Sequence, residues 1–223
     1  MAAQATHVDS LVVADLAVLG ELNSATALLL ERGVLPRGRA YAAATKASGA
    51  RVLVSTRPSG TRSTETSHFI DAQSALPAFP AALKDVATAL HAILTNSATY
   101  RSALFVPALG LSAFAVAGLP LPIVYGSGLL RRTPHPIPLL HRADELDPAE
   151  ILRLIDAHPG NSAVLLAHRG VIAYGDEPLS KLARFVVSLE ESAQLTLNAQ
   201  LLGGAQPLPA DAYEQMQQGI AGD

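Results

Sequence analysis

The sequence predicts a single α/β domain in which helices flank a central, mixed β-sheet. Segments with apolar residues at helical spacing alternate along the chain with short apolar runs that are typical of strands. No linker is long enough to divide the 223 residues, and 49% of them are hydrophobic, which is sufficient for one sizeable core. We therefore treat residues 1–223 as one domain and expect 1–10 and 218–223 to be flexible.

Helical spacing and end signals predict six helices. Gly33 and Gly118 follow two of the periodic segments as C-caps, and Gly203 ends the longest one. Asp147, Pro148 and Glu150 are the residue types that favour the N-cap, N1 and N3 positions of a helix start. The predicted helices are 15–32, 80–96, 111–117, 147–158, 178–202 and 210–217.

Short apolar runs between turn residues predict five strands, at 40–46, 51–55, 103–106, 163–167 and 171–174. The segment 61–75 is rich in Ser and Thr and is expected to form a mobile loop. The segment 119–140 holds five prolines and is expected to form extended pieces and turns.

Composition excludes several classes of function. The net charge of −3 gives no electrostatic basis for nucleic-acid binding. Because the chain has no cysteine, disulfides, thiolate catalysis, iron–sulfur clusters and cysteine-ligated zinc are excluded. No apolar run is long and unbroken enough for a bilayer, and the first residues lack a signal-peptide pattern, so we expect a cytoplasmic protein without membrane contact.

Three segments carry a resemblance to the class II aldolase/adducin family. The stretch 163–175 is similar to its strand, turn, strand and glycine turn, and a long helix follows with Glu190 in its middle and Leu202-Gly203 at its end. Upstream, 103–121 resembles a second signature that ends in Gly118-Leu-Pro-Leu121. Arg57-Pro-Ser-Gly60 is similar to the family's Thr-Pro-Ser-Gly turn. The resemblance covers roughly 15–208.

The resemblance implies a fold, an assembly and a chemistry. Family members are typically homotetramers that bind a divalent ion through three histidines and cleave or rearrange phosphorylated or carboxylated sugars. In such enzymes the ion polarises a carbonyl and stabilises the enediolate that forms. For this chain the resemblance implies a class II aldolase/adducin-like fold and a homo-oligomer, with a tetramer expected. It also suggests that Tyr213 reaches across a subunit interface.

The chain departs from the family at each metal ligand. Phe105-Val106-Pro107 stands where the family has His-x-His, and His168-Arg169-Gly170 stands where it has Asn-His-Gly. Phe and Pro have no lone pair for a metal, and a protonated Arg repels one. The family's Gly-Asn-x-Ser phosphate turn falls on residues 41–44, which are Tyr and three Ala. We therefore expect no metal centre and no cofactor.

Charged residues near these positions are the candidates for a site. Arg169 is expected to hold a carboxylate or phosphate, or to stabilise an enolate, and His168 beside it is a candidate general base. Asp85 falls near the family's acid/base glutamate. Each of the three has a plain alternative: a solvent-facing arginine for Arg169, a partly buried turn histidine for His168, and the solvated face of a helix for Asp85.

Three further expectations concern residues outside this group. Arg57, Ser59 and Gly60 are expected to form a small anion nest. Glu190 is expected to make a structural hydrogen bond or ion pair. His135 and His141 have no third ligand at a recognised spacing, so we expect exposed loop histidines.

Two functional hypotheses follow. The first is a non-catalytic or regulatory protein that binds a small anionic metabolite, either phosphorylated or carboxylated. The second is a metal-independent lyase, decarboxylase or isomerase acting on a small oxo-acid, with Arg169 in place of the ion and His168 or Asp85 moving the proton. Convergence of Arg169, His168 and the Ser59 turn on one pocket favours the enzyme, whereas apolar packing of Phe105 and Pro107 favours the binding protein.

Overall fold

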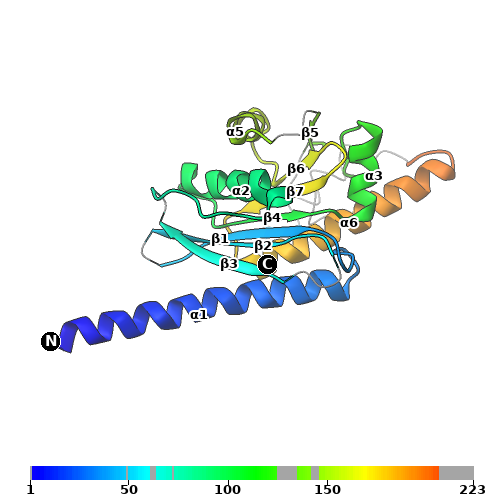
Figure 1. Ribbon diagram of the computed structural model, residues 1–223. Coiled ribbons are helices and arrows are strands. Elements are labelled where there is room, and N and C mark those ends of the chain that lie inside the picture. Colours follow the sequence, from blue (N-terminus) through cyan, green and yellow to red (C-terminus); the bar gives the residue numbers. More distant parts are fainter. Residues whose placement is uncertain are drawn as a thin grey trace, which may run out of the picture.

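A seven-stranded sheet lies between two layers of helices in the computed structural model (Figure 1). The structure describes residues 2–48, 50–60, 64–71, 73–124, 135–141 and 146–205, of which 2–14 are described by their backbone only. All strand neighbours are antiparallel except one parallel pair at the edge, so the predicted mixed sheet is confirmed. In spatial order the strands are β3 (Thr66–Asp71), β2 (Arg51–Arg57), β1 (Tyr41–Lys46), β4 (Ser102–Val106), β7 (Gly170–Gly175), β6 (Ala163–Leu166) and β5 (Leu139–Leu140).

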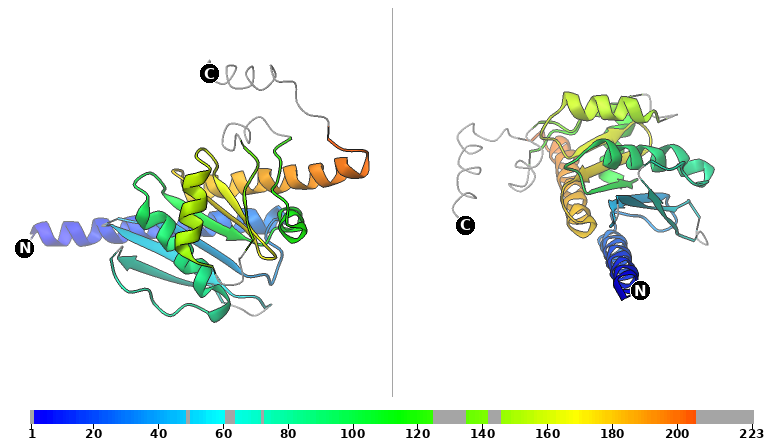
Figure 2. Two further views of the ribbon diagram at one scale, coloured as in Figure 1. Left: turned by 90° about the horizontal axis from the view of Figure 1, so that it is seen from above. Right: turned by 90° about the vertical axis from the view of Figure 1, so that its left-hand side faces the viewer.

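The two faces of the sheet are covered by different helices (Figure 2). On one side lie α1 (Ala2–Glu31), α3 (Leu109–Ala117) and α6 (Leu179–Leu201). On the other side lie the 3₁₀-helix η1 (Ala81–Leu83), α2 (Lys84–Asn96) and α5 (Pro148–Ala157).

Successive side chains along each strand point to opposite faces of the sheet, so the same strands contribute to the apolar cores on both faces. On β2, Leu53 joins the core under α1 and α6, whereas Val52 and Val54 join the core under α2 and α5. This two-sided burial explains why the central strands appear in the sequence as continuous apolar runs.

The helix signals in the sequence are confirmed by cap geometry. The Asp147 side chain accepts a hydrogen bond from the backbone N of Ala149 at 2.9 Å, and Gly118 ends α3 with a φ of 71°.

The first helix begins at Ala2 rather than at residue 15. The predicted helix at 210–217, Tyr213 and the end 218–223 lie outside the described residues. In the described part of the chain, no helix combines the length and apolar character needed to cross a membrane.

The prediction of a loop over 61–75 was wrong, because this segment contains the edge strand β3. Its strand pairing with β2 is reinforced by hydroxyl contacts: Thr56 and Thr66 lie 3.2 Å apart at their Oγ1 atoms, and Ser67 donates to Ser55 at 3.1 Å. An edge strand with polar side chains lacks the apolar alternation by which strands are recognised.

Candidate functional site

The turn between β6 and β7 packs directly against the end of β4. Gly170 has a φ of 144°, and a β-carbon at this position would lie 2.5 Å from the carbonyl oxygen of Val106 and 2.8 Å from the Cα of Pro107. Only glycine permits this approach, because any side chain would overlap the β4 backbone. The two segments 105–107 and 168–170, where the sequence resemblance places the metal-ligand motifs, therefore lie side by side.

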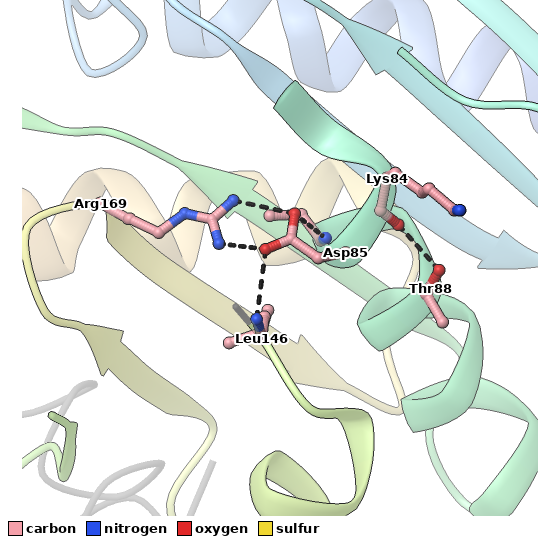
Figure 3. A network of polar contacts seen from close by, with 6 residues as sticks. Lys84, Asp85, Thr88, Leu146 and Arg169 are labelled. Atoms are coloured by element: carbon pink, nitrogen blue, oxygen red, sulfur yellow. Dashed lines mark hydrogen bonds and ion pairs between the residues drawn. The ribbon is translucent and has the colours of Figure 1, made fainter. Parts of the chain in front are cut away.

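Arg169, the last residue of this turn, forms a bidentate ion pair with Asp85 at the start of α2 (Figure 3). Arg169 Nη1 donates to Asp85 Oδ2, and Nη2 donates to Oδ1 at 3.0 Å. The same carboxylate accepts hydrogen bonds from the backbone N of Val86 at 2.8 Å and of Leu146 at 3.3 Å. One carboxylate thus connects α2, the β6–β7 turn and the segment that leads into α5.

The environment of Asp85 favours its charged form. Burial raises the pKa of this carboxyl, but the hydrogen bonds and charge of Arg169, with the backbone N–H groups of Val86 and Leu146, outweigh that effect and hold it below its ordinary value. Asp85 is therefore ionised at neutral pH and is a weak base there.

An open cavity of about 730 Å³ adjoins the ion pair. Lys84 and Arg169 contribute two positive charges to its lining and Asp85 one negative charge, so the cavity wall carries an excess positive charge. Thr88 adds a hydroxyl group, which donates to the carbonyl oxygen of Lys84 at 2.8 Å. The lining residues are Ala81, Ala82, Lys84, Asp85, Thr88, Leu146 and Arg169.

Comparison with solved structures identifies the architecture. L-fuculose 1-phosphate aldolase from Glaciozyma antarctica PI12 matches 88% of this chain and 78% of its own at 13% identity, with a TM-score of 0.64. YgbL of Escherichia coli, a proposed aldolase/epimerase/decarboxylase, matches 92% of this chain and 99% of its own at 16% identity, with a TM-score of 0.64. An aldolase II superfamily protein from Pseudomonas syringae matches 89% of this chain and 82% of its own at 14% identity, with a TM-score of 0.64.

The chain has the class II aldolase fold. This confirms both the predicted fold class and the resemblance seen in the sequence. No protein-family model matches the sequence, and no curated protein matches it. The likeness to the solved structures therefore concerns the fold.

The side chains at the positions where the sequence resemblance places metal ligands do not fit a metal. Phe105 is 4% exposed and packs in the core under α2 and α5, and Pro107 and Arg169 offer no lone pair to a cation. Among the described residues, no group of three or more His, Cys, Asp or Glu side chains could hold an ion. His135 and His141 are exposed, as the sequence predicted.

The class II aldolase fold brings Asp85 and Arg169 together but keeps the other candidates out of the cavity lining. His168 is exposed on the β6–β7 turn, with a φ of 60°. The Arg57 guanidinium lies over the Tyr41 ring at 5.8 Å, and within the described structure its Nε and Nη2 are buried without a hydrogen-bond partner. Ser59 is exposed, and the backbone N of Gly60 donates to the carbonyl oxygen of Gly38 at 2.8 Å. The anion nest at 57–60 stays a prediction.

The structural role predicted for Glu190 is visible at the start of α3. Its buried carboxylate accepts hydrogen bonds from the backbone N of Gly110 at 2.7 Å and of Leu111 at 2.9 Å, and from Gln194 Nε2 at 2.7 Å. This cap satisfies helix N–H groups and anchors α3, which directly follows β4.

Sequence reasoning missed Lys84, Thr88 and Leu146 as lining residues. The available signal was their position: Lys84 and Thr88 lie within one turn of Asp85 at the start of a predicted helix. Leu146 contributes a backbone N–H group, for which its side chain gives no signal.

Proposed function

We propose that this chain is a metal-independent, non-catalytic or regulatory member of the class II aldolase fold that binds a small anion at Arg169. The ligand is a phosphorylated or carboxylated metabolite. The observation that carries the proposal is the guanidinium of Arg169, oriented by Asp85 in the wall of a positively charged cavity. A planar guanidinium is well suited to hold a carboxylate or phosphate through two parallel hydrogen bonds.

Partial burial strengthens such an interaction. The Arg169 side chain is 20% exposed, so its charge is screened less by water and salt than that of a surface arginine. Lys84, on the same cavity wall, adds a second cation to attract an anion. Neither residue requires a metal for this role.

The alternative is a metal-independent lyase, decarboxylase or isomerase acting on a small oxo-acid. It requires Asp85 or His168 to move a proton. Asp85 has a lowered pKa and accepts four hydrogen bonds, whereas efficient acid/base groups have a pKa near the working pH. His168 is exposed and does not line the described cavity. These observations favour binding over catalysis.

Binding can be tested by calorimetric titration of the purified protein with pyruvate, inorganic phosphate and glycerol phosphate. We expect one of them to bind and to raise the melting temperature. At a ligand concentration of 100 times its Kd, binding should increase the free energy of unfolding by about 2.7 kcal/mol. Arg169→Gln should abolish both effects. Arg51→Gln should leave binding and the melting-temperature shift unchanged, because Arg51 forms an ion pair of similar exposure with Asp15 outside the cavity.

Two results would contradict the proposal. The first is the absence of binding for all three anions. The second is turnover of pyruvate or another oxo-acid, followed by NMR and lost in Asp85→Asn, which would establish the lyase alternative.

We also propose that the protein is a homo-oligomer, with a tetramer expected, and that it acts in the cytoplasm. Exposed apolar side chains on α3 and just after it support self-association: Leu109 is 63% exposed, Val116 59% and Leu119 51%. Leu201 and Leu202 at the end of α6 are also exposed. Light scattering after size exclusion measures the assembly, and Leu109→Glu combined with Val116→Glu should dissociate it. A monomeric parent protein would contradict this part of the proposal.

A further inference from the structure

The Asp85 carboxylate occupies the position at Arg169 that a carboxylate ligand needs. It takes both terminal nitrogens of the guanidinium in the end-on, bidentate arrangement that defines a strong arginine–carboxylate pair. The pair lies in the cavity wall, and Asp85 is 23% exposed there. A ligand that enters the cavity therefore meets an arginine whose paired nitrogens already hold a carboxylate of this chain.

We infer that Asp85 is an internal competitor for the ligand of Arg169, and that this ligand is a compact monocarboxylate. The inference rests on the function proposed above and specifies its ligand and its control. Binding exchanges one carboxylate for another: the ligand takes the Nη1 and Nη2 hydrogen bonds, and Asp85 releases them.

Asp85 can release Arg169 without becoming an unpaired buried charge. The backbone N–H groups of Val86 and Leu146 still donate to it. Asp85 also lies in the first turn of α2, where the helix dipole favours a negative charge. Lys84 also lines the cavity, but its side chain extends away from the Asp85 carboxylate (Figure 3).

The charge that stays on Asp85 selects the ligand. A phosphate with nearly two negative charges would be placed next to the displaced carboxylate, and like charges at such distances repel strongly. A monocarboxylate carries the smallest charge that still pairs with both nitrogens of Arg169. The ion pair thus favours acetate-like and oxo-acid ligands over phosphates.

Competition lowers the apparent affinity by the fraction of molecules in which Arg169 is free of Asp85. Removal of the Asp85 carboxylate should therefore tighten binding. We expect Asp85→Ala and the isosteric Asp85→Asn to bind acetate and pyruvate about tenfold more tightly than the parent protein. Asp85→Asn serves as the second variant if the alanine variant does not fold.

The experiment titrates the parent protein and both variants with acetate, pyruvate and inorganic phosphate at constant ionic strength, using calorimetry and thermal shift. Asp15→Ala is the matched control, since it breaks the Asp15–Arg51 pair of similar exposure outside the cavity. Asp85→Ala combined with Arg169→Gln should not respond to acetate. The melting temperature of Asp85→Ala should rise in acetate, as the free carboxylate replaces the missing one.

The outcomes separate this inference from the proposed function. If the parent protein binds anions and the Asp85 variants bind them equally or more weakly, the competition is refuted while anion binding stands. Tighter binding of phosphate than of acetate and pyruvate in the parent protein refutes the monocarboxylate ligand. If only the Asp85 variants bind, competition is supported and binding by the parent chain is refuted. If none of them binds, both proposals are refuted.

Discussion

Gly170 and Val106 approach each other so closely that a β-carbon on Gly170 would lie 2.5 Å from the Val106 carbonyl oxygen. This contact joins β7 to the end of β4 and fixes the turn that carries Arg169. Gly170 has a φ of 144°, a backbone conformation that residues other than glycine rarely adopt. The position of Arg169 therefore depends on the absence of a side chain one residue later.

Gly170→Ala should lower the free energy of unfolding by about 3 kcal/mol or more, because backbone strain and steric overlap act together. Urea denaturation measures the loss. Gly118→Ala is the control: Gly118 also has a positive φ, but no atom lies within 4 Å of the added β-carbon. We expect this control to lose only about 1 kcal/mol. Equal losses in the two variants would show that the Gly170 contact is not tight.

Glu190→Gln should destabilise the protein by about 2 kcal/mol, because an amide cannot accept all three hydrogen bonds that the carboxylate accepts from Gly110, Leu111 and Gln194. Chemical denaturation of the two proteins gives the difference. Glu191→Gln, at the next and exposed position, should change stability by less than about 0.5 kcal/mol. A Glu190 variant as stable as this control would refute the capping role.

The lowered pKa of Asp85 predicts a dependence of stability on pH. Burial raises this pKa, but Arg169 and two backbone N–H groups lower it more, so the folded value lies below the ordinary 3.8. A group of this kind stabilises the fold above its ordinary pKa, and the contribution is lost as the pH falls through the folded pKa.

The free energies of unfolding of the parent protein and Asp85→Asn should therefore differ by a constant amount from about pH 5 to about pH 7. The difference should shrink below about pH 4, where the unfolded-state carboxyl is protonated. A difference that grows on acidification would have the wrong sign for this ion pair. Arg169→Gln should show the same loss of pH dependence, since it removes the partner.

Metal analysis of the purified protein should find no stoichiometric divalent ion, because Phe105, Pro107 and Arg169, at the positions where the sequence resemblance places metal ligands, have no lone pair to donate to a cation. A chelator should leave the melting temperature unchanged, whereas removal of a structural ion would lower it. A tightly held zinc-like ion, or chelator-sensitive aldol cleavage, would overturn the proposed function.

Local signals were sufficient to predict most of the fold. The cap at Asp147 and the apolar stripe of α2 are determined by residues within a few positions of one another, and both are confirmed. The edge strand β3 was missed because only Phe69 and Ile70 in its second half reach the apolar cores, whereas its first half pairs with β2 through hydroxyl groups. A local pattern does not reveal such pairing.

The candidate site was predicted only in part. Asp85 and Arg169 were each selected from the sequence, but their pairing was not, because they are separated by 84 positions. Only the packing of α2 beside the β6–β7 turn makes the two charges neighbours. The turn at 57–60 was grouped with them by resemblance, whereas none of its residues lines the described cavity.

The Asp85 side chain affects both the stability of the fold and the proposed ligand affinity, because the four hydrogen bonds that it accepts include the two from Arg169. A substitution that frees Arg169 for a ligand also disconnects α2 from the β6–β7 turn and from the segment before α5. Tighter binding obtained at this position is therefore accompanied by a lower melting temperature of the unliganded protein. Laboratory evolution for affinity would have to gain compensating mutations elsewhere before it could accept the loss of this aspartate.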